Sequence, residues 1–502
     1  MRTTWNGETS EPKAARRRRR ANRATNAALW AIAAALGFGG WNDWAAGVRV
    51  ETREAAAQEP SALTASVGVD WNAFDEELTF EEDLESRKTS AKDNDNSGNS
   101  GNNGGGGNAE NAENNETVET VENVENAENA ESVAASSGLE VVAKTKNGVL
   151  ARLDGVRDVL ILAGTPAEMG AAHGRLLRDD VLEMNARIAA VGVAASLKTG
   201  ENFAARIEEA TRRTAPFVPE RFFEEMDAMA AATGLEPAQV RRINSFPELF
   251  HCSGVALRGS ATVDGRVLHA RVLDYMRDVG LQNNAALIIY RPTGRNAWLS
   301  VSYAGFVGTV TAMNEKGLAI GEMGGAGEGK WDGLPMAYLM RRVVEECATV
   351  DEALALMRST PLTCDYYYVL SDAAGNMAAV EAIAERDPVL RVMRPGECDP
   401  RLPGALDDCV YISGPGERAD TLFKRLNENF GKIDVPTLIE ILKRPVSMKS
   451  NLHDAIFAPE TLDVWFAEAG ATTPACDEKY FRANLRELLE FYDREQNVSG
   501  EK

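Results

Sequence analysis

The sequence has little histidine and little cysteine, which limits the metal chemistry open to it. Its 502 residues include four histidines and six cysteines. The cysteines form no CxxC pair and have no histidines at zinc-site spacing, so we expect no metal and no other cofactor. Cys398 and Cys409 lie in a loop-like stretch rich in Pro, Gly and Asp, where an exported protein could form a disulfide, although we do not predict one. The cysteines are Cys252, Cys347, Cys364, Cys398, Cys409 and Cys476.

The sequence also lacks a concentrated basic face. Its formal net charge is −22 at pH 7, from 54 Lys and Arg against 76 Asp and Glu. This balance excludes nucleic acid as an expected partner, because a nucleic-acid-binding protein needs clustered positive charge. The acidity says little about the substrate, since many of the carboxylates lie in one repetitive segment. They recur at every third position: Glu110, Glu113, Glu116, Glu119, Glu122, Glu125, Glu128 and Glu131.

No apolar run reaches the roughly 20 residues of a membrane-spanning helix. A shorter run, residues 27–40, follows the basic stretch Arg16–Arg20, and Ala45-Ala46 offers a cleavage site. This order is typical of a secretory signal, so residues 1–46 are predicted to direct export to the periplasm, medium or cell surface. The alternatives are an uncleaved membrane anchor through residues 27–40 and a basic arm that binds anionic partners.

Residues 47–137 have the composition of a disordered linker. They are acidic and rich in Asn, Gly and Ser, and they include the repeated Asn-x-Glu triplets. Such a segment has too few apolar residues to form a core. Residues 138–502 change to globular sequence, long enough for one large core, and we take them as the functional domain.

Cys252 begins a predicted β-hairpin that places three chemically useful residues together. The hairpin runs from Cys252 through the turn signal Asp264-Gly265 to Arg271 and Asp274. Folding the hairpin brings its two ends side by side, and a guanidinium beside a thiol lowers the thiol pKa toward the nucleophilic thiolate. The alternative is ordinary structure: a small buried cysteine and a surface ion pair.

The remaining pattern predicts antiparallel sheets with helices packed outside them. Thr165, Pro166 and Glu168 form the start signal of a helix, with a capping box. Further helices are expected at 204–215, 219–233, 335–346 and 349–357. Strands are expected at 158–164, 285–290, 297–303, 308–313, 318–322, 366–370 and 378–382.

Four stretches in order resemble one family. They are Gly164–Leu177, Cys252–Asp274, Met313–Leu318 and Asn451–Trp465. Across about residues 139–492 the chain resembles the acyl-coenzyme A:6-aminopenicillanic-acid acyltransferases, a branch of the N-terminal-nucleophile hydrolases. The resemblance implies an α+β fold, a four-layer αββα sandwich. Choloylglycine hydrolases and acid-ceramidase-like amidases share the nucleophile hairpin more distantly.

The resemblance also implies a mechanism. The precursor would cleave itself between His251 and Cys252, and the new α-amine, which titrates near neutrality, would take the thiol proton. Asp274 would hold that amine and Arg271 would stabilise the thiolate. The substrate would be a small N-acyl or acyl-thioester compound, which passes its acyl group to Cys252 and then to water or an amine.

The oxyanion donors are the least defined part of the expected site. Related amidases place an asparagine after the strand at 318–322, where this chain has Gly324 and Gly325, and the family often has another asparagine where this chain has Tyr367. These three residues are therefore the oxyanion candidates. Asn314 and Arg418 complete the candidate list, although Asn314 also suits a turn and Arg418 suits an exposed helix start.

The histidines are expected to be structural. His173 and His453 suit packed positions, and the role of His251 would end at cleavage. A second function class stays open beside the enzyme, namely a secreted or surface-anchored binding protein that keeps the fold without turnover. The missing asparagines and the long linker motivate it. The oligomeric state stays open.

Overall fold

Two β-sheets form the centre of the molecule. The computed structural model describes residues 138–497 except 201, 246–250, 276, 325–329 and 386. Within this part of the chain, one sheet has ten strands in the order β1-β2-β3-β6-β7-β8-β9-β10-β11-β12. The other has six strands in the order β13-β4-β5-β14-β15-β16.

The strands of the ten-stranded sheet are β1 (Leu139–Thr145), β2 (Gly148–Leu153), β3 (Arg157–Gly164), β6 (Ala285–Pro292), β7 (Trp298–Tyr303), β8 (Thr311–Asn314), β9 (Ala319–Met323), β10 (Tyr366–Ser371), β11 (Met377–Ile383) and β12 (Val389–Met393). The strands of the six-stranded sheet are β13 (Cys409–Ser413), β4 (His251–Leu257), β5 (Leu268–Asp274), β14 (Asn451–Ala458), β15 (Asp463–Glu468) and β16 (Phe481–Asn484). The helices are α5 (Pro166–Leu176), α6 (Arg178–Thr199), α7 (Phe203–Thr214), α8 (Glu220–Thr233), α9 (Pro237–Ser245), α10 (Met336–Glu346), α11 (Val350–Arg358), α12 (Glu417–Glu428), α13 (Val435–Leu442) and α14 (Leu485–Asn497).

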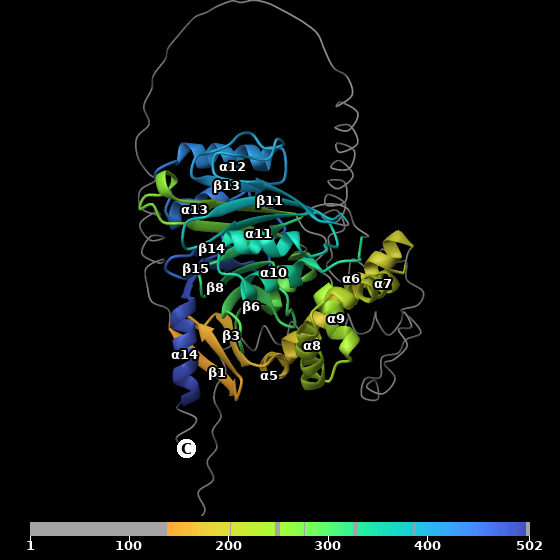
Figure 1. Ribbon diagram of the computed structural model, residues 1–502. Helices are drawn as coiled ribbons and strands as arrows, with labels where there is room; N and C mark the ends of the chain where they lie inside the picture. The colour runs from red at the N-terminus through yellow and green to blue at the C-terminus, as the bar shows by residue number, and fades with distance from the viewer. Residues whose placement is uncertain are drawn as a thin grey trace, which may run out of the picture.

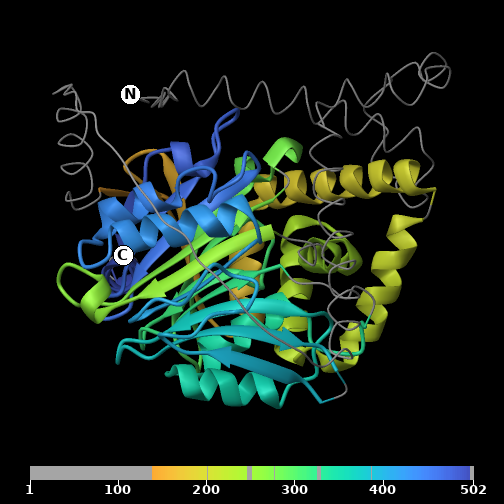
Figure 2. The ribbon, with the colours of Figure 1, turned by 90° about the horizontal axis from the view of Figure 1, so that it is seen from above.

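The two sheets stack face to face. Met323 of β9 lies against Gly254 of β4, where a side chain on Gly254 would collide with its sulfur. His269 of β5 shares a 2.9 Å hydrogen bond with Ser371 of β10. Helices cover the outer faces: α12 contacts β13 and α13 contacts β5 on one side, and α10 contacts β8 and β9 on the other (Figures 1 and 2). The predicted αββα sandwich is therefore confirmed.

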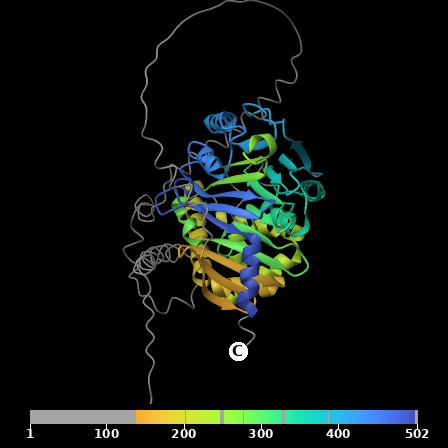
Figure 3. The same ribbon diagram turned by 90° about the vertical axis from the view of Figure 1, so that its left-hand side faces the viewer.

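One sheet edge is closed by the last helix. Helix α14 contacts β16 of one sheet and β3 of the other, and Figure 3 shows it running beside the first strands of the described chain. Strand β3 pairs with β6 in parallel, whereas all other paired strands are antiparallel. The expectation of purely antiparallel sheets is wrong at this point, because the chain crosses from β3 to β6 through the helices α5 to α9 and the hairpin β4–β5.

The nucleophile hairpin forms as predicted, with a longer connection. Strands β4 and β5 pair antiparallel, with Cys252 opposite Leu273 and Gly254 opposite Arg271. Residues 258–267 join them and include a short 3₁₀ turn at Gly259–Ala261, so the connection is not a tight turn at Asp264-Gly265. Gly265 still has a positive φ of 76°, a backbone conformation that favours glycine.

The helix starts are well predicted and one long helix is not. The capping box of α5 is present, with the Thr165 side chain accepting from the Glu168 N–H and Glu168 accepting from the Thr165 N–H. Helix α6 was not expected from the pattern, because its apolar residues are not confined to one face. The predicted export signal at 1–46 and linker at 47–137 lie outside the described residues. None of the described helices has the length and hydropathy needed to cross a membrane.

Candidate active site

Cys252 and Arg271 meet in the buried space between the two sheets. Cys252 is 4% exposed and Arg271 is 0% exposed. Arg271 donates through Nη2 to the Cys252 Sγ over 3.0 Å, and through Nε to the Glu322 carbonyl over 3.1 Å. The same Nη2 lies 3.2 Å from Oε2 of Glu322, whose side chain is fully buried. The site therefore holds a thiol, a guanidinium and a carboxylate in direct succession.

Burial dominates the ionisation of the thiol in the intact chain. It raises the pKa of Cys252 to about 12, while Arg271 lowers it and the carboxylates Glu322 and Asp274 raise it further. The predicted lowering of this pKa is therefore wrong for the intact chain. Arg271 does not produce a thiolate there, because its charge is largely balanced by Glu322 and the site excludes water. An additional base is needed to deprotonate the thiol.

Asp274 lies at the end of β5, beside the peptide bond that precedes Cys252. Its backbone is opposite His251 in the β4–β5 ladder. The carboxylate is 1% exposed and accepts from the Met448 N–H through Oδ1 over 2.8 Å. Through Oδ2 it accepts from Nη2 of Arg418. Two donors thus fix the Asp274 carboxylate at the end of β5, whose backbone pairs with the residue before Cys252.

Arg418 belongs to this arrangement. It enters from the first turn of α12, donates through Nε to the Val446 carbonyl over 2.9 Å, and donates through Nη2 to the Ser253 hydroxyl over 2.9 Å. Its side chain is 14% exposed, so the reading as a solvent-facing helix start is excluded. Ser253 in turn shares a 2.9 Å hydrogen bond with Ser413 of β13.

Tyr367 and Asn314, two of the other candidates, make hydrogen bonds to groups other than the thiol. The Tyr367 hydroxyl donates to Glu381 over 2.8 Å, and the Tyr367 ring lies under the guanidinium of Arg401. Asn314 donates to the Val344 and Cys347 carbonyls and accepts from the N–H groups of Lys316 and Leu318, so it forms the turn after β8. Gly324 directly follows β9, and Gly325 lies outside the described residues.

The buried histidines have structural partners. His173 accepts from the Gly305 N–H, and burial lowers its pKa to about 3. His453 lies within β14 and shares hydrogen bonds of 2.8 Å with Tyr303 and 2.9 Å with Thr311, and burial lowers its pKa well below the usual value. Both match the expected structural role. The side chain of His251 is outside the described set, and all six cysteines are free thiols, so Cys398 and Cys409 are not bonded.

An apolar cavity adjoins the thiol. Its volume is about 50 Å³. Leu273, which is opposite Cys252 in the ladder, forms part of its wall together with Tyr303. The other lining residues come from α6, α9, β14 and the segments after β5 and before β8: Met184, Ile188, Ile243, Tyr275, Leu281, Phe306, Val310 and Leu452. Cys252 does not itself line the cavity, and Leu273 is the residue that connects the two.

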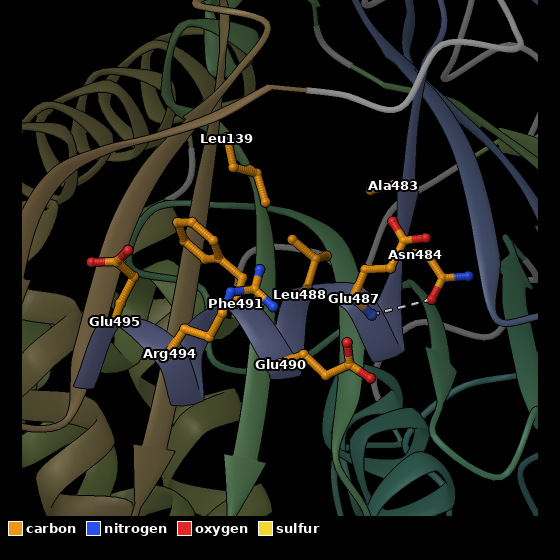
Figure 4. A pocket seen from close by; sticks show the side chains of 9 residues that line it. All are labelled: Leu139, Ala483, Asn484, Glu487, Leu488, Glu490, Phe491, Arg494 and Glu495. Carbon is orange, nitrogen blue, oxygen red and sulfur yellow. Dashed lines mark hydrogen bonds between the residues drawn. The ribbon is translucent and has the colours of Figure 1, made fainter. Parts of the chain in front are cut away.

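A larger depression lies elsewhere, under α14. Its volume is about 440 Å³, and Leu139 and Phe491 contribute apolar surface to it (Figure 4). Glutamates on α14, including Glu487 and Glu490, line it as well. None of the predicted site residues lines this depression, so we do not connect it with Cys252.

Sequence reasoning missed two parts of the site. Glu322 is at the end of β9, and only the packing of that strand against β4 and β5 brings it to Arg271. Gly414 follows Ser413, which is opposite Ser253 in the β13–β4 ladder, so the backbone at Gly414 reaches the level of Cys252. The one sequence signal for Gly414 was its position directly after the short apolar segment that forms β13. Among the described residues, no group of three or more His, Cys, Asp and Glu side chains is placed to hold a metal ion.

Comparison with known proteins agrees with the predicted relationship. Protein dcd1B of Dictyostelium discoideum is 24% identical over 356 residues, which are 63% of this chain and 69% of that protein. Acid ceramidase of Homo sapiens is 26% identical over 195 residues, 34% of this chain and 48% of that protein. The solved structure of an N-acylethanolamine-hydrolyzing acid amidase ortholog from Caenorhabditis elegans has 16% identity and a TM-score of 0.33, covering 42% of this chain and 93% of that one.

A family model identifies the relationship directly. It matches residues 270–396, a range that includes Arg271, Asp274, Glu322 and Tyr367 but begins after Cys252 and ends before Arg418. Over residues 270–396 the chain is similar to the acyl-coenzyme A:6-aminopenicillanic acid acyl-transferase family, as the sequence resemblance predicts.

Proposed function

We propose that this protein is a self-processing cysteine amidase or acyltransferase that acts on small N-acyl or acyl-thioester compounds. The observation that carries the proposal is the arrangement at the start of β4. Cys252 Sγ accepts from Arg271 over 3.0 Å, and Asp274 lies beside the peptide bond between His251 and Cys252. The proposal assigns Cys252 as the nucleophile, Arg271 as the cation that stabilises its anion and Asp274 as the carboxylate that holds the new amine.

Self-cleavage is the first step of the proposed mechanism. The Cys252 sulfur attacks the His251 carbonyl carbon, the peptide C–N bond breaks, and the Cys252 nitrogen takes the thiol proton to become an amine. Water then hydrolyses the thioester, which leaves a carboxylate on His251 and a free thiol on Cys252. Burial holds the pKa of the thiol at about 12 before cleavage, so the intact site lacks a base for it. The new α-amine supplies that base.

The catalytic cycle reuses the same atoms. The amine accepts the thiol proton, the sulfur attacks the substrate carbonyl, and the amine returns the proton to the departing nitrogen or sulfur of the substrate. The product of this step is an acyl-cysteine at residue 252. Water, or a second amine in the case of acyl transfer, then attacks the thioester and releases the acyl group. Asp274 holds the amine, and Arg418 and the Met448 N–H hold Asp274.

The substrate's acyl half is proposed to be apolar. The cavity beside Leu273 is lined by aliphatic and aromatic side chains and lies in the same hydrophobic cluster as Cys252. Burial of a hydrocarbon chain there contributes roughly 0.8 kcal/mol per methylene. Acid ceramidase, one of the similar proteins, is named for a ceramide substrate, which agrees with this assignment.

Backbone groups are proposed to stabilise the oxyanion. The Tyr367 hydroxyl and the Asn314 side chain donate to other acceptors, which leaves them poorly suited to the task. The N–H groups of Gly324 and Gly414 follow strands that end beside the thiol, and glycines allow close approach of a substrate.

The test uses the full chain and a screen of amides. Penicillin V, a conjugated bile acid, N-dodecanoyl glycine and N-dodecanoyl ethanolamine would be incubated with the wild type and with Cys252→Ala. The proposal expects the wild type alone to release acyl product and to cleave itself. A wild-type chain that stays whole and hydrolyses none of these amides would favour the alternative, a binding protein without turnover.

A further inference from the structure

Asp454 is a buried carboxyl group that the proposed mechanism leaves unused. It lies within β14 and is fully buried. Its Oδ1 accepts from the Asn451 side chain over 2.8 Å, and its Oδ2 accepts from the Tyr480 hydroxyl over 2.8 Å. A buried carboxyl held by two neutral donors has no cation in direct contact, so its ionisation depends on the more distant charges around it.

Asn451 joins Asp454 to the end of β5. The Asn451 side chain donates to the Leu273 carbonyl over 3.1 Å and accepts from the Cys476 N–H over 2.7 Å. The backbone of Asn451 is opposite Asp274, and the β14–β5 register shifts between Asn451 and His453. The irregular start of β14 therefore contacts Leu273 and Asp274, the residues that pair with Cys252 and His251.

The loop that precedes β14 also bonds to the end of β5. The Tyr275 N–H donates to the Ser450 carbonyl over 3.1 Å, and the Met448 N–H donates to the Asp274 carboxylate over 2.8 Å. Asp274, Ser450 and Asn451 are thus fixed to one another by backbone and side-chain bonds. Any shift of Asn451 would displace the carboxylate that faces the proposed amine.

The charges around Asp454 come from several elements. Strand β5 contributes Asp274, which raises the pKa of Asp454, and Arg271, which lowers it. The segment 476–480 contributes Cys476, Asp477 and Tyr480, α13 contributes Glu440 beyond Tyr480, and α12 contributes Arg418 through Asp274. Burial is the largest effect and raises the pKa of Asp454, the hydrogen bonds from Asn451 and Tyr480 lower it, and the resulting pKa is about 7.

We propose that Asp454 is a positioning residue which, through Asn451, holds the Leu273–Asp274 end of β5 against Cys252 and which exchanges a proton in response to the charge at that site. The catalytic part of this inference rests on the proposed function, and the structural part does not. Ionised Asp454 stabilises the protonated form of the Cys252 amine. It thereby raises the pH at which the amine becomes a free base.

The first test is the pH profile of the processed enzyme. The variants are Asp454→Asn and Tyr480→Phe, and the probe is the dodecanoyl amide of 7-amino-4-methylcoumarin. Asp454→Asn is expected to move the acidic limb of kcat/KM to lower pH by roughly half to one pH unit, because a negative charge near the amine is lost. Asp463→Asn is the matched control: this buried aspartate of β15 bonds to Arg482, Thr461 and Asn484. An unchanged limb in Asp454→Asn would overturn the catalytic part.

The second test needs no turnover. Infrared spectroscopy of the full-length chain would follow the band of a protonated carboxylic acid through pH 5 to 9, with Asp454→Asn identifying the Asp454 contribution. Asp274→Asn is expected to lower the midpoint of this band, and Tyr480→Phe to raise it. An unchanged midpoint in both would overturn the link to the site. Absence of a fragment at Cys252 and of turnover would instead count against the proposed function, and this readout would still stand.

Discussion

Arg271 donates a 3.0 Å hydrogen bond to the sulfur of Cys252 in a space where neither side chain reaches solvent. The guanidinium is also bound to Glu322, so the thiol, the cation and the carboxylate form one buried group. In the intact chain the thiol stays protonated, because burial outweighs the effect of the cation. This relationship makes the new α-amine the necessary element of the proposed chemistry, and it leads to the predictions below.

Arg271→Met is predicted to destabilise the fold by about 3–5 kcal/mol, because it removes the cation that lies 3.2 Å from the fully buried Glu322 carboxylate. The double variant Arg271→Met with Glu322→Gln should recover much of that loss. Urea denaturation measures both, and equal stability of the single and double variants would show that the pair does not act as a unit. Neither variant is expected to process itself.

Arg418→Met is predicted to slow self-cleavage and turnover by about 10-fold or more, since Asp274 loses its cation. Arg425→Met is the matched control on the same helix, because Arg425 donates to the carbonyls of Ile441, Lys443 and Arg444 and not to the site. The control should lose stability and keep the cleavage rate per folded molecule. Equal cleavage rates per folded molecule in the two variants would show that Arg418 has no role in the reaction.

Much of this site was predictable because it is local. Cys252, Arg271 and Asp274 occupy one hairpin, and hairpin pairing follows from strand pattern and turn chemistry. Glu322 was not predictable as a partner, because only the stacking of the two sheets brings β9 to β5. Asn314 entered the candidate list by residue type alone, and its hydrogen bonds assign it to a turn.

The same distinction applies to the fold. The start of α5 was predictable from its capping box, a contact within one helical turn. The parallel pairing of β3 with β6 was not, because more than a hundred residues separate the strands and no local signal specifies the partner. Helix α6 was missed for a related reason: it is covered by other elements on several sides and shows no single apolar face.

Ile188→Ala is predicted to shift acyl preference toward longer chains, because it enlarges the cavity beside Leu273. The variant should also lose about 2–5 kcal/mol of stability. Ile161→Ala, a buried residue of a hydrophobic cluster that includes none of the residues lining this cavity, is the matched control and should lose stability without a change in preference. Competition between N-octanoyl and N-hexadecanoyl glycine measures the preference. The same ratio of the two hydrolysis rates in the wild type and both variants would show that the cavity does not bind the acyl group.

The buried histidines predict a loss of stability in acid. Burial lowers the pKa values of His173 and His269 to about 3 and that of His453 well below its usual value, so the folded state binds fewer protons than the unfolded chain below the unfolded value of 6.5. The histidines therefore do not reduce the free energy of unfolding above about pH 6.5, and they reduce it progressively as the pH drops toward 3. At pH 5 each histidine costs about 2 kcal/mol relative to pH 7.

The histidine prediction is tested by urea denaturation at the two pH values. His269→Gln removes one of the three titrating groups and should reduce the difference between pH 7 and pH 5 by about 2 kcal/mol, whatever its effect on absolute stability. A variant that keeps the full difference would show that His269 is protonated as readily in the folded state as in the unfolded chain.

The central claim is that Cys252 becomes an N-terminal nucleophile, and intact-mass spectrometry of the purified full-length protein tests it most directly. The account predicts two fragments in the wild type, one ending at His251 and one beginning at Cys252 with a free α-amine. It predicts a single uncut chain in Cys252→Ala. A wild-type protein that stays whole, or a cut that persists at this bond in Cys252→Ala, would contradict it.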